Sequence, residues 1–139
     1  MCIRDRSKAL TYKAGKRGVT FKLDDGIRIE LLAPFEPPLS GTRSDLNSNS
    51  VIVRLTKGAH CMLFTGDAEE PTEHMLVQKG LEPCDVLKVA HHGSGHSSTA
   101  HFLDAVKPTY ALISAGEGNR YKHPYPETLQ RLELSLIHI

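Results

Sequence analysis

Residues 61–67 (CMLFTGD) and residues 85–94 (DVLKVAHHGS) share one design, in which an apolar strand is followed at once by polar residues of the kind that bind ligands. In layered α/β folds the ends of such strands form a rim, where side chains from separate strands meet at one ligand. We therefore expect Asp67 and His92 to come close together. Residues 118–124 (GNRYKHP) follow another apolar strand and are expected on the same rim.

The rest of the sequence predicts a mixed α/β layer architecture, in which helices cover a sheet. Two hairpins are expected, the first around the Asp-Gly turn at residues 24–26, and they argue against a purely doubly wound fold. Residues 34–49 are rich in Pro, Ser and Asn and are expected to form a long functional loop. The predicted elements are strands at 19–23, 27–32, 51–55, 61–65, 85–89 and 110–114, and helices at 69–79, 99–106 and 126–132.

The composition fits one ordinary soluble domain. The chain has 139 residues, of which 40% are hydrophobic, and a formal net charge of +1. This charge gives no support to a protein that coats nucleic acid or lies on a membrane surface, and no apolar run approaches the roughly 20 residues of a membrane-spanning helix. The cysteines Cys2, Cys61 and Cys84 lack CxxC spacing. We therefore expect neither a disulfide framework nor a zinc finger, and a reducing compartment.

The two ends of the chain are expected to lie outside the fold. Residues 1–6 (MCIRDR) and 134–139 (LSLIHI) resemble translated sequencing-adapter sequence, and neither has a signal-peptide pattern. Residues 11–132 are predicted to form a partial domain, which makes the chain a fragment truncated on both sides. The alternative is that the ends are natural and disordered.

Each candidate residue also has a purely structural interpretation. Asp67 precedes a predicted helix and could be its N-cap. His91 and His92 could be surface-loop residues, but a His-His-Gly-Ser run directly after a buried strand favours metal or proton chemistry. His123 precedes a proline and could simply shape a turn.

Five segments of the sequence, taken in chain order, resemble a known family. The chain is similar, over roughly residues 19–132, to the C-terminal half of a metallo-beta-lactamase-fold domain of the ComEC competence-protein type. The resemblance implies an αββα sandwich whose rim binds two divalent metal ions, and which hydrolyses the DNA strand that is not imported during transformation. The matching segments are residues 45–55 (DLNSNSVIVRL), 61–67, 85–94, 102–114 (FLDAVKPTYALIS) and 118–132 (GNRYKHPYPETLQRL).

The resemblance assigns the metal ligands of this half. Asp67 matches the carboxylate that bridges two metal ions, and one carboxylate can give an oxygen to each of two ions about 3.5–4 Å apart. His92, which precedes a glycine, matches the last ligand histidine, with His91 as the alternative. Whichever imidazole is not a ligand, and Ser94, are candidates for positioning a phosphate.

The resemblance also implies a set of residues that face the substrate. Asn119 and His123 match the GNRYxHP segment and are candidates for gripping the scissile phosphate or protonating the leaving group. Arg120 and Lys122 add cations, which suit a phosphodiester better than a neutral ester. Asn49 belongs to an Asn-x-Asn-Ser pattern that is common in this family, and it is assigned to substrate binding together with Ser50.

Departures from the family pattern leave several functions open. The main metal motif of the superfamily, HxHxDH, is absent from the chain and would lie upstream of Thr11. We expect a metal-dependent DNA phosphodiesterase or exonuclease domain that serves DNA uptake, inactive as this fragment alone. Its ions would be manganese or zinc, its substrate single-stranded DNA, and the full-length protein could carry a membrane channel and sit in a bacterial inner membrane. The alternatives are a stand-alone lactonase or thioesterase, or a non-catalytic relic of the fold.

Overall fold

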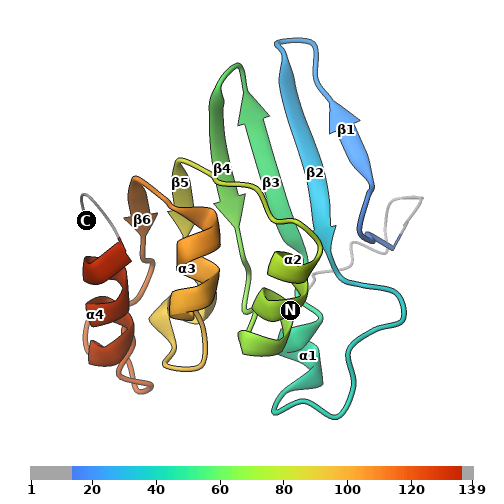
Figure 1. Ribbon diagram of the computed structural model, residues 1–139. Coiled ribbons are helices and arrows are strands. Elements are labelled where there is room, and N and C mark those ends of the chain that lie inside the picture. Colours follow the sequence, from blue (N-terminus) through green and yellow to red (C-terminus); the bar gives the residue numbers. More distant parts are fainter. Residues whose placement is uncertain (1–13, 136–139) are drawn as a thin grey trace, which may run out of the picture.

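The computed structural model describes residues 14–135, which form one sheet and its helices (Figure 1). Every strand and helix predicted from the sequence is confirmed, with ends shifted by a few residues. A short helix, α1, and a 3-10 turn, η1, were not expected. In chain order the elements are β1 (Thr20–Lys22), β2 (Ile27–Ala33), α1 (Asp45–Ser48), β3 (Ile52–Lys57), β4 (His60–Phe64), α2 (Glu70–Gln78), β5 (Val86–Lys88), η1 (Ala90–Gly93), α3 (Ala100–Val106), β6 (Tyr110–Leu112) and α4 (Pro126–Ser135).

The C-terminal boundary differs slightly from the expected one. Helix α4 continues to Ser135, two residues into the segment 134–139 that was expected to lie outside the fold. Leu134 is 83% exposed, so this last turn adds little to the core. The expectations for residues 1–6 and 136–139, and the first residues of the segment 11–132, fall outside the described residues.

The six strands lie in one mixed sheet in the order β1-β2-β3-β4-β5-β6. The first four strands are antiparallel. Tight turns join β1 to β2 and β3 to β4, and the first of these contains Gly26 at a φ of +80°, whereas the long loop with α1 joins β2 to β3. Strands β4, β5 and β6 are parallel, which requires the crossover helices α2 and α3 between them. All three parallel strands therefore end at the same edge of the sheet.

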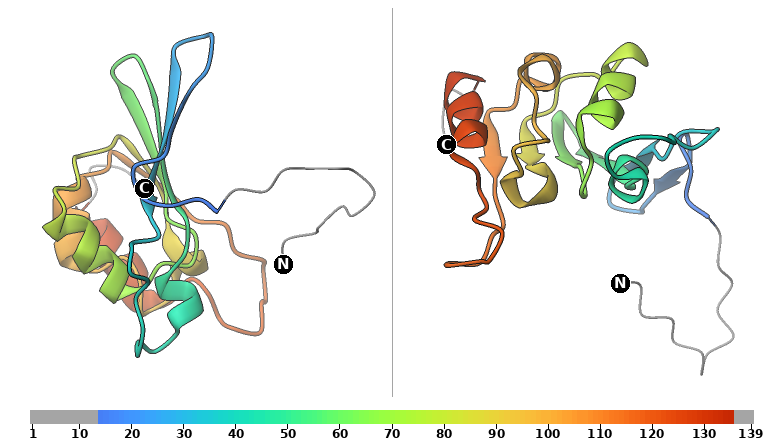
Figure 2. Two further views of the ribbon diagram at one scale, coloured as in Figure 1. Left: turned by 90° about the vertical axis from the view of Figure 1, so that its right-hand side faces the viewer. Right: turned by 90° about the horizontal axis from the view of Figure 1, so that it is seen from below.

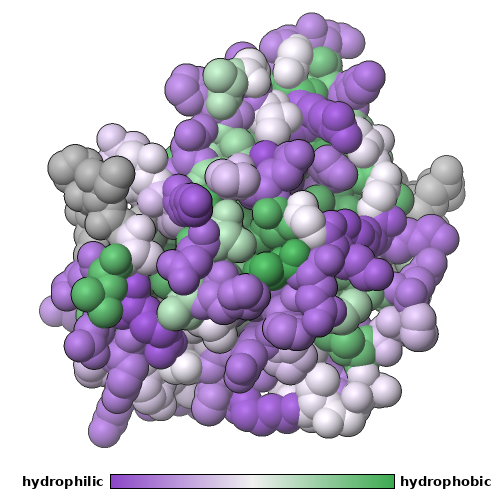
Figure 3. Space-filling model, in the orientation of Figure 1, coloured by the Kyte–Doolittle hydropathy of each residue, from purple (hydrophilic) through white to green (hydrophobic). Residues whose placement is uncertain are grey.

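Helices α2, α3 and α4 cover one face of this sheet, and the core lies between the two layers (Figure 2). The outer side of the helix layer, seen in Figure 3, is largely hydrophilic. Core side chains come from alternate strand positions, as Cys61 and Leu63 in β4 illustrate. The largest fully buried apolar side chains are Ile52, Leu63, Leu76, Leu87, Val89, Phe102, Leu103, Val106 and Leu132.

The other face of the sheet has no covering layer among the described residues. The intervening β4 residues Met62 and Phe64 are only half-buried, and Tyr110 and Leu112 in β6 are 53% and 48% exposed. A sheet that is apolar on both faces is typical of the inner layer of a sandwich. The structure thus shows a mixed α/β protein with helices on one face, whereas the αββα sandwich and the metallo-beta-lactamase fold stay predictions.

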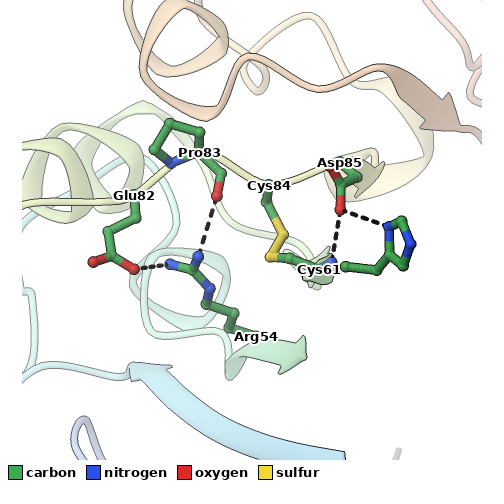
Figure 4. Close-up of a disulfide and its surroundings, with 7 residues drawn as sticks. Arg54, Cys61, Glu82, Pro83, Cys84 and Asp85 are labelled. Atoms are coloured by element: carbon green, nitrogen blue, oxygen red, sulfur yellow. Dashed lines mark hydrogen bonds and ion pairs between the residues drawn. A yellow bond between two sulfur atoms is a disulfide. The ribbon is translucent and has the colours of Figure 1, made fainter. Parts of the chain in front are cut away.

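A disulfide joins Cys61 and Cys84, so the expectation that the cysteines form no disulfide was wrong (Figure 4). Their Cα atoms lie 5.0 Å apart, although 23 residues separate them in the sequence. Cys61 lies at the start of β4 and Cys84 just before β5, and the parallel register of these strands pairs Met62 with Val86. Sheet pairing, not sequence spacing, brings the two sulfurs together. Disulfides form under oxidising conditions, which argues against the expected reducing compartment.

None of the helices in residues 14–135 has the length and apolar character needed to cross a bilayer.

A buried carboxylate joins α2 to the start of α3. Glu73 is 1% exposed, and its side chain accepts hydrogen bonds from the backbone N–H groups of Ser98 and Thr99. Burial raises the pKa of Glu73 from 4.5 to about 7, against the opposing effects of those two donors and the charge of Arg131. The folded chain therefore keeps the Glu73 proton over a pH range in which the unfolded chain releases it.

This linkage predicts a loss of stability between about pH 4.5 and pH 7. Because the folded-state pKa of Glu73 is raised, its contribution is complete below pH 4.5 and disappears as the pH rises through about 7. The free energy of unfolding of the parent chain should therefore decline between pH 4.5 and pH 8. We expect Glu73→Gln, which mimics the protonated acid, to reduce this decline by up to about 3 kcal/mol. Urea denaturation at several pH values measures this difference.

The matched control is Glu70→Gln, which removes an exposed carboxylate from the same helix. It should retain the pH dependence of the parent chain. Parallel stability curves for the parent and the Glu73→Gln chain would contradict the assignment.

Candidate functional site

Polar segments follow β4, β5 and β6 at the edge where these parallel strands end, the lower edge in Figure 1. The His91 N–H donates to the Gly66 carbonyl over 2.9 Å, which joins the segments after β4 and β5. The His92 Nδ1 lies 2.5 Å from the Ser114 carbonyl, which joins the segments after β5 and β6. The prediction that these three segments share one rim is therefore confirmed.

Gly66 allows the loop before β3 to reach the same rim. Its φ is +53°, and a Cβ atom there would lie 3.2 Å from the Ser50 Cβ. The Asp67 N–H donates to Ser50 Oγ over 3.2 Å. Ser50, predicted to bind substrate, therefore lies directly against the candidate metal ligand Asp67.

Gly93 likewise allows the segment before α4 to pack closely against the rim. A Cβ atom there would lie 2.6 Å from the Pro124 Cβ, and the residue has a φ of +84°. The Tyr125 N–H donates to the Gly93 carbonyl over 2.9 Å. Only glycine fits this approach, so the HHGS and GNRYKHP segments are packed against each other through backbone atoms.

The two histidines of HHGS adopt a backbone conformation that is rare for such residues. His91 and His92 have φ values of 47° and 56°, inside the 3-10 turn η1. Left-handed residues other than glycine cost of order 1 kcal/mol or more each, and they cluster at functional sites. This turn sends the two imidazoles to different places, since His92 is exposed while His91 is 25% exposed.

His92 is held as a metal-binding histidine usually is. With Nδ1–H donated to the Ser114 carbonyl, Nε2 keeps its lone pair free for an ion. Asp67 is exposed, and the N-cap of α2 is Glu69, which removes the interpretation of Asp67 as the cap. Beside Asp67 lies Lys88, whose pKa is lowered by burial, an effect that the Asp67 charge opposes. Asp67 and His92 can thus both offer electron pairs at the rim.

Two buried imidazole nitrogens at this rim have no hydrogen-bond partner among the described residues. They are Nδ1 of His91 and Nδ1 of His123, and the centroids of the two rings lie 5.6 Å apart. Burial, together with the nearby His91 and His92, lowers the pKa of His123. Because buried polar atoms rarely stay unpaired, these two nitrogens are candidates for contact with a further polar or charged group.

Glu69 lies at the candidate site but was not a candidate in the sequence analysis, where it was only the first residue of the helix predicted at 69–79. It is 2% exposed, and its Oε1 lies 3.7 Å from His91 Nδ1. Arg43 forms an ion pair with Glu69, and Asn47 Nδ2 donates to Oε1 over 2.9 Å. The buried carboxylate therefore links the loop around α1 to His91. The one sequence signal that could have drawn attention to Glu69 is its position, two residues after the TGD motif.

Three of the predicted site residues, Asn119, Asn49 and Ser94, use their side chains for hydrogen bonds within the fold. The Asn119 carboxamide bonds the backbone of Gly116 and His123. Asn49 binds the backbone of Leu39 and Asp45, which holds the long loop in shape.

Ser94 is 3% exposed, and its Oγ accepts the His96 N–H over 3.3 Å. The structure therefore places Ser94, Asn49 and Asn119 in supporting positions. Arg120 and Lys122 remain exposed to solvent.

The donors of the described residues fit part of a metal site. Across residues 14–135, no three His, Cys, Asp or Glu side chains are grouped closely enough to hold an ion. Asp67 and His92 supply two ligands of the types that manganese and zinc accept, and the unpaired nitrogen of His91 is a candidate third. The class defined by fold and rim is therefore a mixed α/β domain with a partial ligand cluster at the ends of its parallel strands.

The chain is homologous to a segment of competence proteins of the ComEC type. It is 32% identical to ComE operon protein 3 of Bacillus subtilis over 96% of its length, and 41% identical to competence protein ComA of Neisseria gonorrhoeae over 72%. It is 36% identical to recombination protein 2 of Haemophilus influenzae over 77% of its length. The chain spans only 17%, 14% and 13% of these relatives, respectively. No model of a known protein family matches it.

Proposed function

We propose that this chain is part of a metal-dependent DNA phosphodiesterase domain that serves DNA uptake. The observation that carries the proposal is the packing, at one edge of the sheet, of the segments that carry Asp67 and His92 with the GNRYKHP segment. Homology to proteins named for competence supports the link to DNA uptake. The uncovered apolar face of the sheet supports the αββα sandwich, because such a face calls for a second layer.

Different residues of the chain would perform different parts of phosphodiester hydrolysis. Asp67 and His92 would hold the divalent ions, manganese or zinc, which stabilise negative charge on a phosphate when bound. His123 lies beside His91 and offers an imidazole to a phosphate or leaving-group oxygen. Arg120 and Lys122 attract the polyanion, and Asn119 holds His123 through the loop backbone.

Comparing substrates tests this proposal directly. A longer version of the chain that includes an HxHxDH motif should hydrolyse single-stranded DNA in the presence of manganese or zinc. A lactone and a thioester, assayed side by side, are the substrates of the small-molecule alternative. Faster turnover of either one would replace the nuclease proposal, and no turnover of any substrate would support a non-catalytic relic.

Metal content provides a separate prediction. In the longer version we expect close to two divalent ions per chain, and Asp67→Ala should lose at least one, because Asp67 would be one of the residues that hold them. Elemental analysis of the purified protein measures the ratio. Asp45→Ala is the control, since Asp45 is an exposed carboxylate that accepts hydrogen bonds from Gly41 and Thr42 and is not an assigned metal ligand. Full occupancy in the Asp67→Ala protein would refute the assignment.

A further inference from the structure

The segment between β6 and α4 carries exposed aromatic rings that the proposed metal chemistry does not use. Tyr121 is 57% exposed and Tyr125 is 41% exposed. The His123 ring lies between them in the sequence, with its centroid 5.9 Å from that of Tyr121 and 5.3 Å from that of Tyr125. The Tyr121 and His123 planes are only 17° apart, so the two rings present a nearly common orientation.

Cations accompany these rings. The Arg120 guanidinium carbon lies 4.6 Å from the Tyr121 ring centroid, and Nη2 of Arg120 donates to the Tyr121 hydroxyl. The contact with the ring face places a positive charge beside the aromatic surface. Lys122 adds a second exposed cation. Aromatic rings interleaved with cations are the composition of surfaces that bind single-stranded nucleic acid, where bases stack on the rings and cations follow the backbone.

A small pocket opens between the rings of Tyr121 and His123 and the candidate metal ligand His92. Its volume is about 210 Å³, below the roughly 300–1,000 Å³ of sites that enclose drug-sized ligands, so it suits a single planar ring system. Figure 2 shows the segment after β6 projecting away from the helix layer, where a strand can approach it. The pocket is lined by His92, Ala115, Gly116, Asn119, Tyr121 and His123.

We propose that Tyr121 and this pocket form a base-stacking subsite for single-stranded nucleic acid. A base would enter the pocket and pack against the part of the Tyr121 ring that lines it, while its backbone phosphate lies toward Arg120. In a duplex the bases are already stacked and paired, so the subsite selects an unpaired strand. The position of this base next to the hydrolysed bond rests on the proposed function, but the stacking itself requires neither metal nor hydrolysis.

Binding of oligonucleotides in EDTA tests the subsite without any metal. The 139-residue chain is titrated with fluorescent oligothymidylate and with an abasic oligomer of equal length, which keeps the phosphates and lacks the bases. We expect Tyr121→Ala to weaken oligothymidylate binding about 5- to 100-fold, the range for one lost base stack, and to leave abasic binding unchanged. Tyr121→Phe keeps the aromatic ring and should bind like the parent chain.

The matched control is Tyr110→Ala, which removes a tyrosine of similar exposure, 53%, from β6. It should not change affinity for either oligomer. Equal weakening of thymidylate and abasic binding by Tyr121→Ala, no weakening at all, or a parent chain that does not prefer the base-containing oligomer would each overturn the inference. A chain that binds thymidylate through Tyr121, while the longer version never cleaves DNA, would overturn only the proposed function.

Discussion

Replacing His123 by alanine is expected to slow DNA hydrolysis by about 10²- to 10⁴-fold in the longer version of the chain, the usual contribution of a positioned acid or base. The His123 ring lies at the rim with its Nδ1 buried and unpaired within residues 14–135. Because His123 also lines the pocket beside His92, its imidazole can face a phosphodiester oxygen there, and loss of the imidazole would leave that oxygen without a donor. Initial rates on labelled single-stranded DNA measure the effect.

Metal content and a control variant distinguish a catalytic role of His123 from an indirect effect on the site. The His123→Ala protein should keep its ions, because Asp67 and His92, not His123, are the assigned ligands of this half. His101→Ala, which removes an exposed histidine from α3, is the matched control and should cleave at the parental rate. Cleavage of DNA by the His123→Ala protein at the parental rate would contradict the assignment. Loss of ions together with activity would instead make His123 a metal ligand.

Removing the disulfide is expected to lower the free energy of unfolding by about 3 kcal/mol. The bond between Cys61 and Cys84 closes a loop with a sequence separation of 23 residues, and a loop of this size restricts the unfolded chain by about that amount. The double variant Cys61→Ala, Cys84→Ala removes the bond in every environment. Urea denaturation of the parent and the variant, both without reductant, measures the difference.

Neighbouring contacts determine how much order survives without the bond (Figure 4). Arg54 pairs with Glu82 over 2.8 Å and donates to the Pro83 carbonyl over 3.1 Å, and Asp85 accepts the Cys61 N–H over 2.8 Å. These contacts should keep β4 and β5 paired, so the variant is expected to fold at lower stability. Reductant should destabilise the parent and leave the double variant unchanged. Equal stability of parent and variant would show that the bond adds nothing.

Local patterns predicted most of the fold. The Asp-Gly turn at residues 24–26 and the alternating segments around it were sufficient to predict the first hairpin, because turn chemistry and side-chain alternation act over a few residues. Polar residues directly after apolar strands predicted where Asp67 and His92 would lie. Helix α1 was not predicted, because four residues are too few to produce a periodic pattern.

The supporting contacts of the candidate site could not be predicted in this way. The partner of His92 Nδ1 is a backbone carbonyl, Ser114, and any residue type could have provided it. Glu69 resembled an ordinary helix-start acid until folding buried it against Arg43. Both contacts join segments more than twenty residues apart, and their formation depends on the strand register and loop packing of the whole sheet.

The sequence alone therefore determines the element types, the edge of the sheet that carries the polar residues and the kinds of chemistry those residues can perform. The tertiary structure decides which groups stay free at that edge. It commits the side chains of Ser94, Asn49 and Asn119 to internal hydrogen bonds, and it pairs Cys61 with Cys84. The physical reason is that propensity and turn chemistry act between near neighbours, whereas burial and hydrogen-bond partners arise only when distant segments pack together.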